Sequence, residues 1–275
     1  MTETIMTAKP AKQPTNWANE VWQLFLLLLA VLGVHSLIAK PFYIPSGSML
    51  PTLFIGDRLI VSKFPYGYSY LSPSFNILPE FPGRLFGSLP DRGDIVVLKS
   101  PRTKDDWIKR VVGLPGDTVQ MKDGVFWLNG KPVPKLPVAP VDIVVSANSD
   151  CNTPIDQQYR AADAQGRAIC RYPRFRETLP NGRSYDVMDL AETPQDNTEP
   201  AIVPEGHVFV MGDNRDNSED SRFDPLLGGI GMLPVENLVG RAEFTTFSLD
   251  GSTTLNPLTW FGAFRGERAF IGLNK

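Results

Sequence analysis

Two serines in the segment IPSGSMLPTL, residues 44–53, are the first candidates for chemistry in this chain. Ser46 and Ser48 flank Gly47, and a proline on each side restricts the backbone, so the sequence predicts a tight turn that holds both hydroxyls. A serine that attacks a carbonyl carbon needs a base to take its proton and donors to stabilise the oxyanion. The segment does not form the nucleophile elbow G-x-S-x-G, because Ser46 and Leu50 occupy its glycine positions around Ser48.

Histidine, the usual base for such a serine, is scarce in this chain. His35 lies within a long apolar run, and His207 opens a predicted strand, where a surface position is expected. A Ser-His-Asp triad is therefore disfavoured, and another base has to be considered.

Lys109 is that alternative base. Side chains alternate along the predicted strand 107–113, so Lys109 shares one face with Trp107 and Val111. Burial beside these apolar groups would lower the pKa of the amine and let it accept a proton. The same pattern also fits a lysine that keeps its ammonium in water at a strand edge, with Arg110 in a structural ion pair. The alternation alone leaves both interpretations open.

The segment MGDNRDNSEDSR, residues 211–222, is rich in carboxylates and amides and invites comparison with a calcium loop. An EF-hand loop starting at Asp213 would need Asp or Asn third, Gly sixth and Glu twelfth, but Arg215, Ser218 and Asp224 stand there. The arginines of the segment would also repel a cation. We therefore expect no metal here, and instead paired Asp and Arg side chains that shape a loop presenting Ser218.

The long apolar run VWQLFLLLLAVLGVHSLIA, residues 21–39, carries no charge and has the length of a transmembrane helix. Lys40 and aromatic residues follow it, rather than the small residues of a cleavage site, which indicates an uncleaved anchor. Lys9 and Lys12 precede it, which favours a cytoplasmic N-terminus. Residues 1–20 are predicted to form a disordered cytoplasmic tail.

The rest of the chain is predicted to be mainly β, an antiparallel sheet or barrel-like domain. The 25 prolines and 23 glycines of the whole chain mostly punctuate short β-branched runs in this part. The net charge of the whole chain, −3, argues against nucleic-acid binding. Asp-Gly and Asn-Gly in residues 118–131 are the strongest hairpin signals. Further strands are predicted at 57–64, 93–100, 107–113, 207–213 and 239–248.

Two proline-containing segments, 131–140 and 190–204, break this pattern and are predicted to be extended linkers. The more polar stretch between them suggests a lobe, residues 131–202, inserted between two parts of a catalytic β domain, residues 40–130 and 203–275. The second part includes the C-terminal tail.

Five motifs, in order after the apolar run, closely resemble the bacterial type I signal peptidases: IPSGSMLPTL, GDRLIVSKF, GDIVVLKSP, WIKRVVGLPGD and GDNRDNSEDSR. The resemblance covers roughly residues 40–130 and 203–243. It implies a membrane-bound endopeptidase that removes signal peptides from exported preproteins, recognises small residues at substrate positions −1 and −3, and needs no cofactor or metal. Its β domain would lie on the outer face of the cytoplasmic membrane.

The resemblance also implies roles for individual residues. Ser48 would be the nucleophile and Lys109 the general base, while Ser46 would donate its hydroxyl to the oxyanion hole beside the Ser48 backbone N–H. Ser218 would hydrogen-bond and orient Lys109. Supporting salt bridges would come from four further residues that this chain also has: Asp213, Asp220, Arg110 and Arg222. The single span, the lobe and the C-terminal tail are this chain's own departures from some members.

The predicted topology places Cys151 and Cys170 in an oxidising compartment, where they could form a disulfide. Aromatic segments at 64–71, 75–86 and 258–264 could enter the lipid interface or cover the protein's own core, and both interpretations stay open.

Two rival functions are a peptidase specialised for pilin or conjugation proteins and a membrane-anchored β domain that binds partners without catalysis. The second is disfavoured, because a dead site has no reason to keep Ser46, Ser48, Lys109 and Ser218 together.

Overall fold

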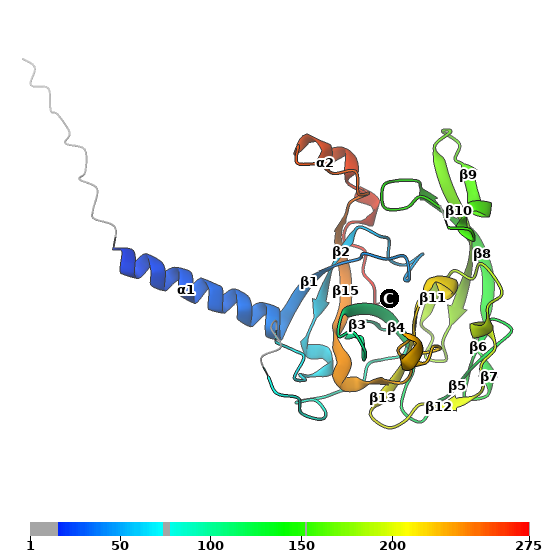
Figure 1. Ribbon diagram of the computed structural model, residues 1–275, viewed down its shortest axis with the longest axis horizontal. Coiled ribbons are helices and arrows are strands. Elements are labelled where there is room, and N and C mark those ends of the chain that lie inside the picture. Colours follow the sequence, from blue (N-terminus) through cyan, green and yellow to red (C-terminus); the bar gives the residue numbers. More distant parts are fainter. Residues whose placement is uncertain (1–15, 74–77, 152, 275) are drawn as a thin grey trace, which may run out of the picture.

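The computed structural model describes residues 16–73, 78–151 and 153–274 and shows a long helix that projects from one side of a body built from antiparallel strands (Figure 1). The predicted fold class, mainly β, is confirmed. Helix α1 (Trp17–Gly33) continues through a π-helical turn (Val34–Ile38) directly into strand β1 (Ala39–Tyr43). The span Trp17–Ile38 is long and apolar enough to cross a membrane, and none of its apolar window is buried in the protein.

The helix begins earlier than the predicted anchor. Asn16 caps it by accepting a hydrogen bond from the Asn19 N–H at 3.4 Å. Residues 17–20, which the sequence assigned to a disordered tail, are therefore helical, and residues 1–15 lie outside the described residues.

The main sheet has seven strands in the order β1-β2-β15-β3-β4-β13-β14, and all its pairings are antiparallel. Besides β1, its strands are β2 (Asp57–Ser62), β3 (Ile95–Lys99), β4 (Asp106–Gly113), β13 (His207–Met211), β14 (Leu233–Pro234) and β15 (Leu238–Ser248). All five of the further strands predicted from sequence are present within a few residues of the expected ends.

A second sheet, in the order β12-β5-β6-β7, contains the predicted hairpins. Asp123 and Gly124 have φ values of 47° and 70°, and Asn129 and Gly130 have 53° and 75°. Positive φ at both central residues is the signature of a type I′ turn, so the two hairpin predictions are confirmed. The strands are β5 (Thr118–Lys122), β6 (Val125–Leu128), β7 (Lys131–Pro132) and β12 (Ala201–Ile202).

The prediction of an extended linker at 131–140 is wrong, because this segment supplies β7 and much of β8 in a third sheet. The prolines of β8 are tolerated because β8 pairs only with β10 and so lies at an edge. The segment 190–204 is largely irregular, with one short 3-10 turn and β12. The third sheet contains β8 (Lys135–Val144), β9 (Arg160–Ala162), β10 (Ala168–Thr178) and β11 (Ser184–Val187).

The third sheet is joined to the second by a common core. Leu179, Tyr185 and Val187 pack in one buried cluster with Val119 and Phe126 of the second sheet. The segment predicted as an inserted lobe therefore shares its core with the strands that precede it.

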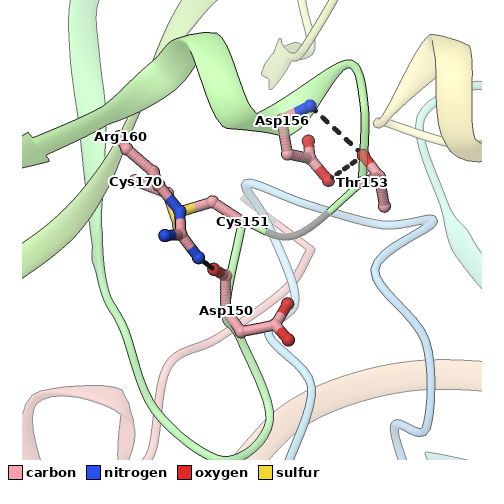
Figure 2. The surroundings of a disulfide bond; sticks show 6 residues. All are labelled: Asp150, Cys151, Thr153, Asp156, Arg160 and Cys170. Carbon is pink, nitrogen blue, oxygen red and sulfur yellow. Dashed lines mark hydrogen bonds between the residues drawn. A yellow bond between two sulfur atoms is a disulfide. The ribbon is translucent and has the colours of Figure 1, made fainter.

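Cys151 and Cys170 form a disulfide whose Cα atoms are 6.0 Å apart, at one end of β10 (Figure 2). Figure 2 also shows Arg160 reaching the carbonyl of Asp150, at 2.9 Å, across the bridge. Both cysteines are buried in a cluster that includes Leu50, two residues after Ser48. The bridge thus joins the loop around Cys151 to β10, and the bridged cysteines pack beside the serine turn.

The aromatic segments differ in burial, which confirms the core role for part of the first segment and leaves the lipid interface as a prediction for the exposed ones. Tyr66 is buried in the core, whereas Phe86 is 92% exposed and Phe261, on helix α2 (Leu258–Ala263), is 83% exposed. Residues 74–77 of the second segment lie outside the described residues. The short 3-10 turns are Phe64–Tyr66, Asp156–Tyr159, Pro194–Asp196, Arg215–Asn217, Pro225–Leu227, Val235–Asn237 and Gly266–Arg268.

Candidate active site

The serine turn lies between β1 and β2 and is held from below by its own apolar side chains. The backbone N–H of Ile44 donates to the Asp57 carbonyl at 2.9 Å, which closes the base of the loop. Met49 and Leu53 are fully buried in a core cluster of the main sheet. Because its apolar residues point into the core, the turn leaves Ser48 at the floor of a surface cleft of about 600 Å³.

Lys109 meets Ser48 in this cleft. Its Nζ donates to the Ser48 Oγ at 3.1 Å, and the two side chains come from residues 61 positions apart. Only 4% of Lys109 is exposed, so the alternative of a lysine reaching water at a strand edge is wrong. Its Nζ lies 5.5 Å from the centroid of the Trp107 ring, which is the neighbour that the alternation along β4 predicts.

Burial in the cleft shifts the amine of Lys109 toward its neutral form. Burial lowers the pKa of Lys109 from 10.5 to about 8, and the nearby carboxylates of Asp220 and Glu219 oppose this shift without cancelling it. At neutral pH roughly a tenth of the lysine is then unprotonated, against well under 1% for a free lysine. The arrangement can therefore take a proton from the serine hydroxyl.

Ser46 and Ser218 line the same cleft, Ser46 exposed at its rim and Ser218 buried. The hydrogen bond expected between Ser218 and Lys109 is not formed: among the described residues the Ser218 Oγ has no partner. The lysine instead directs its bond to Ser48. Ser218 thus lies beside the lysine without holding it by a hydrogen bond.

Gly212 sets how closely the loop 211–222 approaches the serine turn, and the sequence did not single it out. A Cβ on Gly212 would lie 2.2 Å from the Ser218 Oγ and 2.6 Å from the Ser48 carbonyl oxygen. The second of these atoms is backbone and has little freedom to move. Only glycine lets the two serines come this close.

The charged residues of the site form two buried ion pairs. Arg110 donates to Asp213 at 2.6 and 2.8 Å, and Arg222 donates to Asp220 at 2.9 Å. Asp220 also accepts from the Gly212 N–H at 3.0 Å. Burial opposes ionisation of Asp220, but the ion pair with Arg222 outweighs it and the pKa of this carboxyl is lowered. These pairs fix the loop that faces the serine turn.

Asn214 joins the two loops directly and was missed by the sequence reasoning. Its backbone N–H donates to the Ser48 carbonyl at 3.0 Å, and its side-chain Nδ2 donates to the Gly47 carbonyl at 3.2 Å. The only signal was its place in the polar segment 211–222, where an amide cannot be told from other turn residues by type alone.

Neither histidine lines the cleft. His35 lies in the apolar span, and the Nδ1 of His207 lies 3.0 Å from the Glu205 carbonyl oxygen. The structure therefore leaves Lys109 as the basic side chain in contact with Ser48.

Within the described part of the chain, three carboxylates lie close together, one of them in the loop 211–222. Oxygens of Asp189, Asp196 and Asp216 lie within 4.8 Å of one another. The ammonium of Lys135 pairs with Asp189 and supplies the positive charge at this cluster, so we assign no metal site to these carboxylates. Sequence could not reveal it, because its members come from separate segments.

Comparison with known proteins decides the family to which this site belongs. The family model described as "Signal peptidase, peptidase S26" matches residues 17–247. The chain belongs to the signal peptidase family. Membership makes it a serine peptidase, in agreement with a serine whose hydroxyl accepts a hydrogen bond from a buried lysine.

Curated relatives in this family match most of the chain. A signal peptidase I of Rickettsia akari (strain Hartford) is 36% identical over 251 residues, which cover 88% of this chain and 82% of that protein. The signal peptidase I of Rickettsia massiliae (strain Mtu5) is 37% identical with the same coverage. A crystal structure of a signal peptidase I from Enterococcus faecalis V583 is 24% identical and covers 56% of this chain and 97% of that one, with a TM-score of 0.29.

Proposed function

We propose that this chain removes N-terminal signal peptides from exported preproteins, with Ser48 as nucleophile and Lys109 as general base. The observation that carries the proposal is the 3.1 Å contact between the Lys109 Nζ and the Ser48 Oγ in a buried site. Family membership suggests the substrate class, and the lowered pKa of Lys109 allows its amine to act as the proton acceptor.

The reaction follows from this geometry. The neutral amine of Lys109 takes the proton of Ser48 as its Oγ bonds to the scissile carbonyl carbon, and the resulting ammonium returns that proton to the leaving amine as the C–N bond breaks. Lys109 then deprotonates the water that hydrolyses the acyl-enzyme. The Ser48 backbone N–H and the Ser46 hydroxyl at the cleft rim would stabilise the oxyanion.

The substrate would present small side chains at positions −1 and −3 to shallow apolar subsites. The cleft combines a buried floor at Ser48 and Lys109 with apolar walls that include Ile108 and Phe223. A general peptidase would accept many precursors of this kind, whereas a specialised pilin or conjugation-protein peptidase would accept few.

The exposed apolar groups support a place at the membrane surface. Tyr43 on β1 and Phe247 on β15 are partly exposed, and the Arg58 guanidinium lies 5.3 and 5.4 Å from their ring centroids. Helix α2 adds exposed Leu258 and Phe261. We infer that α1 anchors the chain and that these groups rest in the lipid interface, where aromatic rings and arginine are favoured.

The orientation of the anchor follows from the same proposal. The N-terminus would be cytoplasmic and the β domain would lie outside the bacterial inner membrane. The disulfide between Cys151 and Cys170 fits the oxidising compartment found there.

The test is cleavage of preproteins by the full chain in detergent. A panel of precursors with Ala-x-Ala before the cut should be processed, and Ser48→Ala prepared in parallel should yield no product. Processing of a single precursor would favour the specialised peptidase, and cleavage by Ser48→Ala at the normal rate would refute the proposed mechanism.

A further inference from the structure

A buried ion pair connects the third sheet to the loop that faces the catalytic cleft. The Glu177 side chain on β10 and the Arg215 side chain are each only 1% exposed. The Arg215 Nη2 donates to the Glu177 Oε2 at 2.6 Å, and the Tyr185 hydroxyl donates to the same oxygen at 2.9 Å. The Glu177 Oε2 therefore accepts from two donors, whereas its Oε1 and the Arg215 Nη1 are buried with no hydrogen-bond partner among the described residues.

Arg215 opens the 3-10 turn Arg215–Asn217, and the next residue is Ser218. Its Nε donates to the Gly212 carbonyl at 3.2 Å, and its own carbonyl accepts from the Arg222 Nη2 at 2.6 Å. Asn217 and Ser218 both line the cleft. The side chain and the backbone of Arg215 thus tie together the turn that forms one wall of the cleft.

Tyr185 extends the connection to a second point of the same loop. Its ring lies 4.2 Å from the Arg110 guanidinium, and Arg110 pairs with Asp213. A buried ion pair adds little net stability compared with well-packed apolar groups, whereas it can fix one arrangement of the chain. The role of such a pair is then geometric.

We propose that Glu177 is a positioning residue for the peptidase: its carboxylate fixes Arg215 and, through it, the turn that places Asn217 and Ser218 in the cleft. This inference rests on the proposed function and gives the third sheet a part in it. Glu177 itself touches no reacting atom.

The first test is Glu177→Gln in the full chain, with activity expressed per folded enzyme. The amide leaves the buried guanidinium uncompensated, so the turn should shift. Since a misplacement of about 1 Å can cost roughly 10²-fold, we expect kcat to fall about tenfold or more while KM stays within about twofold. Asp186→Asn is the matched control, because Asp186 on β11 forms partly exposed ion pairs with Arg174 and Arg176 on β10, the strand that carries Glu177. Its kcat should stay at the wild-type value.

The double variant Glu177→Gln/Arg215→Met decides between positioning and stability, because it leaves no unpaired buried charge. We expect its melting temperature to recover toward wild type while kcat stays low, and the pH dependence of kcat/KM to be unchanged, since the charged neighbours of Lys109 are untouched. Recovery of kcat together with the melting temperature would overturn the inference. Wild type and Ser48→Ala run beside it: an inactive wild type would count against the proposed function instead.

Discussion

Two lysines of this chain are buried to a similar extent but have very different opportunities for chemistry. Lys63 is 2% exposed and Lys109 is 4% exposed, and burial lowers the pKa of each from 10.5 to about 8. The Nζ of Lys63 donates to the carbonyl of Ser72 at 2.7 Å, whereas that of Lys109 donates to the hydroxyl of Ser48.

The difference shows that desolvation of a lysine, which lowers its pKa, is not enough to make it a base. The lysine also needs a partner that can give up a proton. A carbonyl oxygen has no proton to give, so Lys63 can only be a structural donor. Lys109 faces a hydroxyl at the floor of an open cleft, where a substrate carbonyl can reach the same oxygen. The partner atom, and not the pKa, separates the two lysines.

The largest effect is expected from replacing Lys109, the proposed base, or Ser48, the proposed nucleophile. Lys109→Met should abolish turnover, as should Ser48→Ala, because the hydroxyl then lacks a base or the acyl-enzyme cannot form. Both variants should melt near the wild-type temperature, since methionine fills the space of a desolvated amine. Lys109→His should not restore activity, because its shorter side chain cannot reach the Ser48 Oγ; activity near the wild-type level in this variant would contradict the assignment.

Ser46→Ala tests the other requirement of the cleft, stabilisation of the oxyanion. We expect kcat to fall by roughly 10²–10³, the usual loss for one oxyanion donor, with the protein still folded. Steady-state kinetics on a preprotein measure it. A kcat within twofold of wild type would remove Ser46 from the oxyanion hole.

Gly212→Ala tests how closely the two loops must approach. The added methyl would lie 2.6 Å from the Ser48 carbonyl oxygen, so the serine turn and the loop have to separate. We expect a loss of about 10²-fold in kcat. Gly262→Ala is the control, because nothing lies within 4 Å of its added Cβ, and its kcat should equal that of wild type. Equal activity of the two variants would show that the close approach is unimportant.

The smallest effect on activity is expected from Lys63→Met, with kcat within about twofold of wild type. Its effect should appear in stability. Between pH 8 and 10.5 an unfolded lysine holds a proton that folded Lys63 has lost, so raising the pH stabilises the fold, by about 3 kcal/mol for a shift of this size. Lys63→Met removes this contribution, so the free energy of unfolding should rise less with pH in the variant than in the wild type.

Urea unfolding at pH 8 and pH 10 measures this difference. A loss of more than tenfold in kcat for Lys63→Met would break the comparison, because it would tie the second lysine to the chemistry.

Sequence could predict one of these lysines and not the other. Lys109 stands in the middle of β4, where alternation with Trp107 reveals its face. Lys63 follows the last residue of β2, and its burial depends on the chain that folds over it as far as Ser72. The alternation of side chains along a strand does not predict a contact of that kind.

Across the fold and the site, features set by local sequence were predicted, whereas features set by contacts between separate segments were not. Hairpins were predictable because Asp123 and Asn129 precede glycines in turns that need positive φ. The edge position of β8 was not, because it depends on pairing with β10, far along the chain. The contacts of Asn214, and a Ser218 hydroxyl that has no partner in the described part of the chain, are set by how two loops meet, which residue types alone do not specify.

The pH dependence of kcat/KM on a preprotein, measured for the wild-type chain in detergent, tests most directly the claim that Lys109 is the base. Its folded pKa of about 8 predicts that log kcat/KM rises with unit slope below that pH and levels off above it. A rate that is flat from mildly acidic to alkaline pH would contradict this claim. So would a rising limb centred near the pKa of a free lysine, about 10.4.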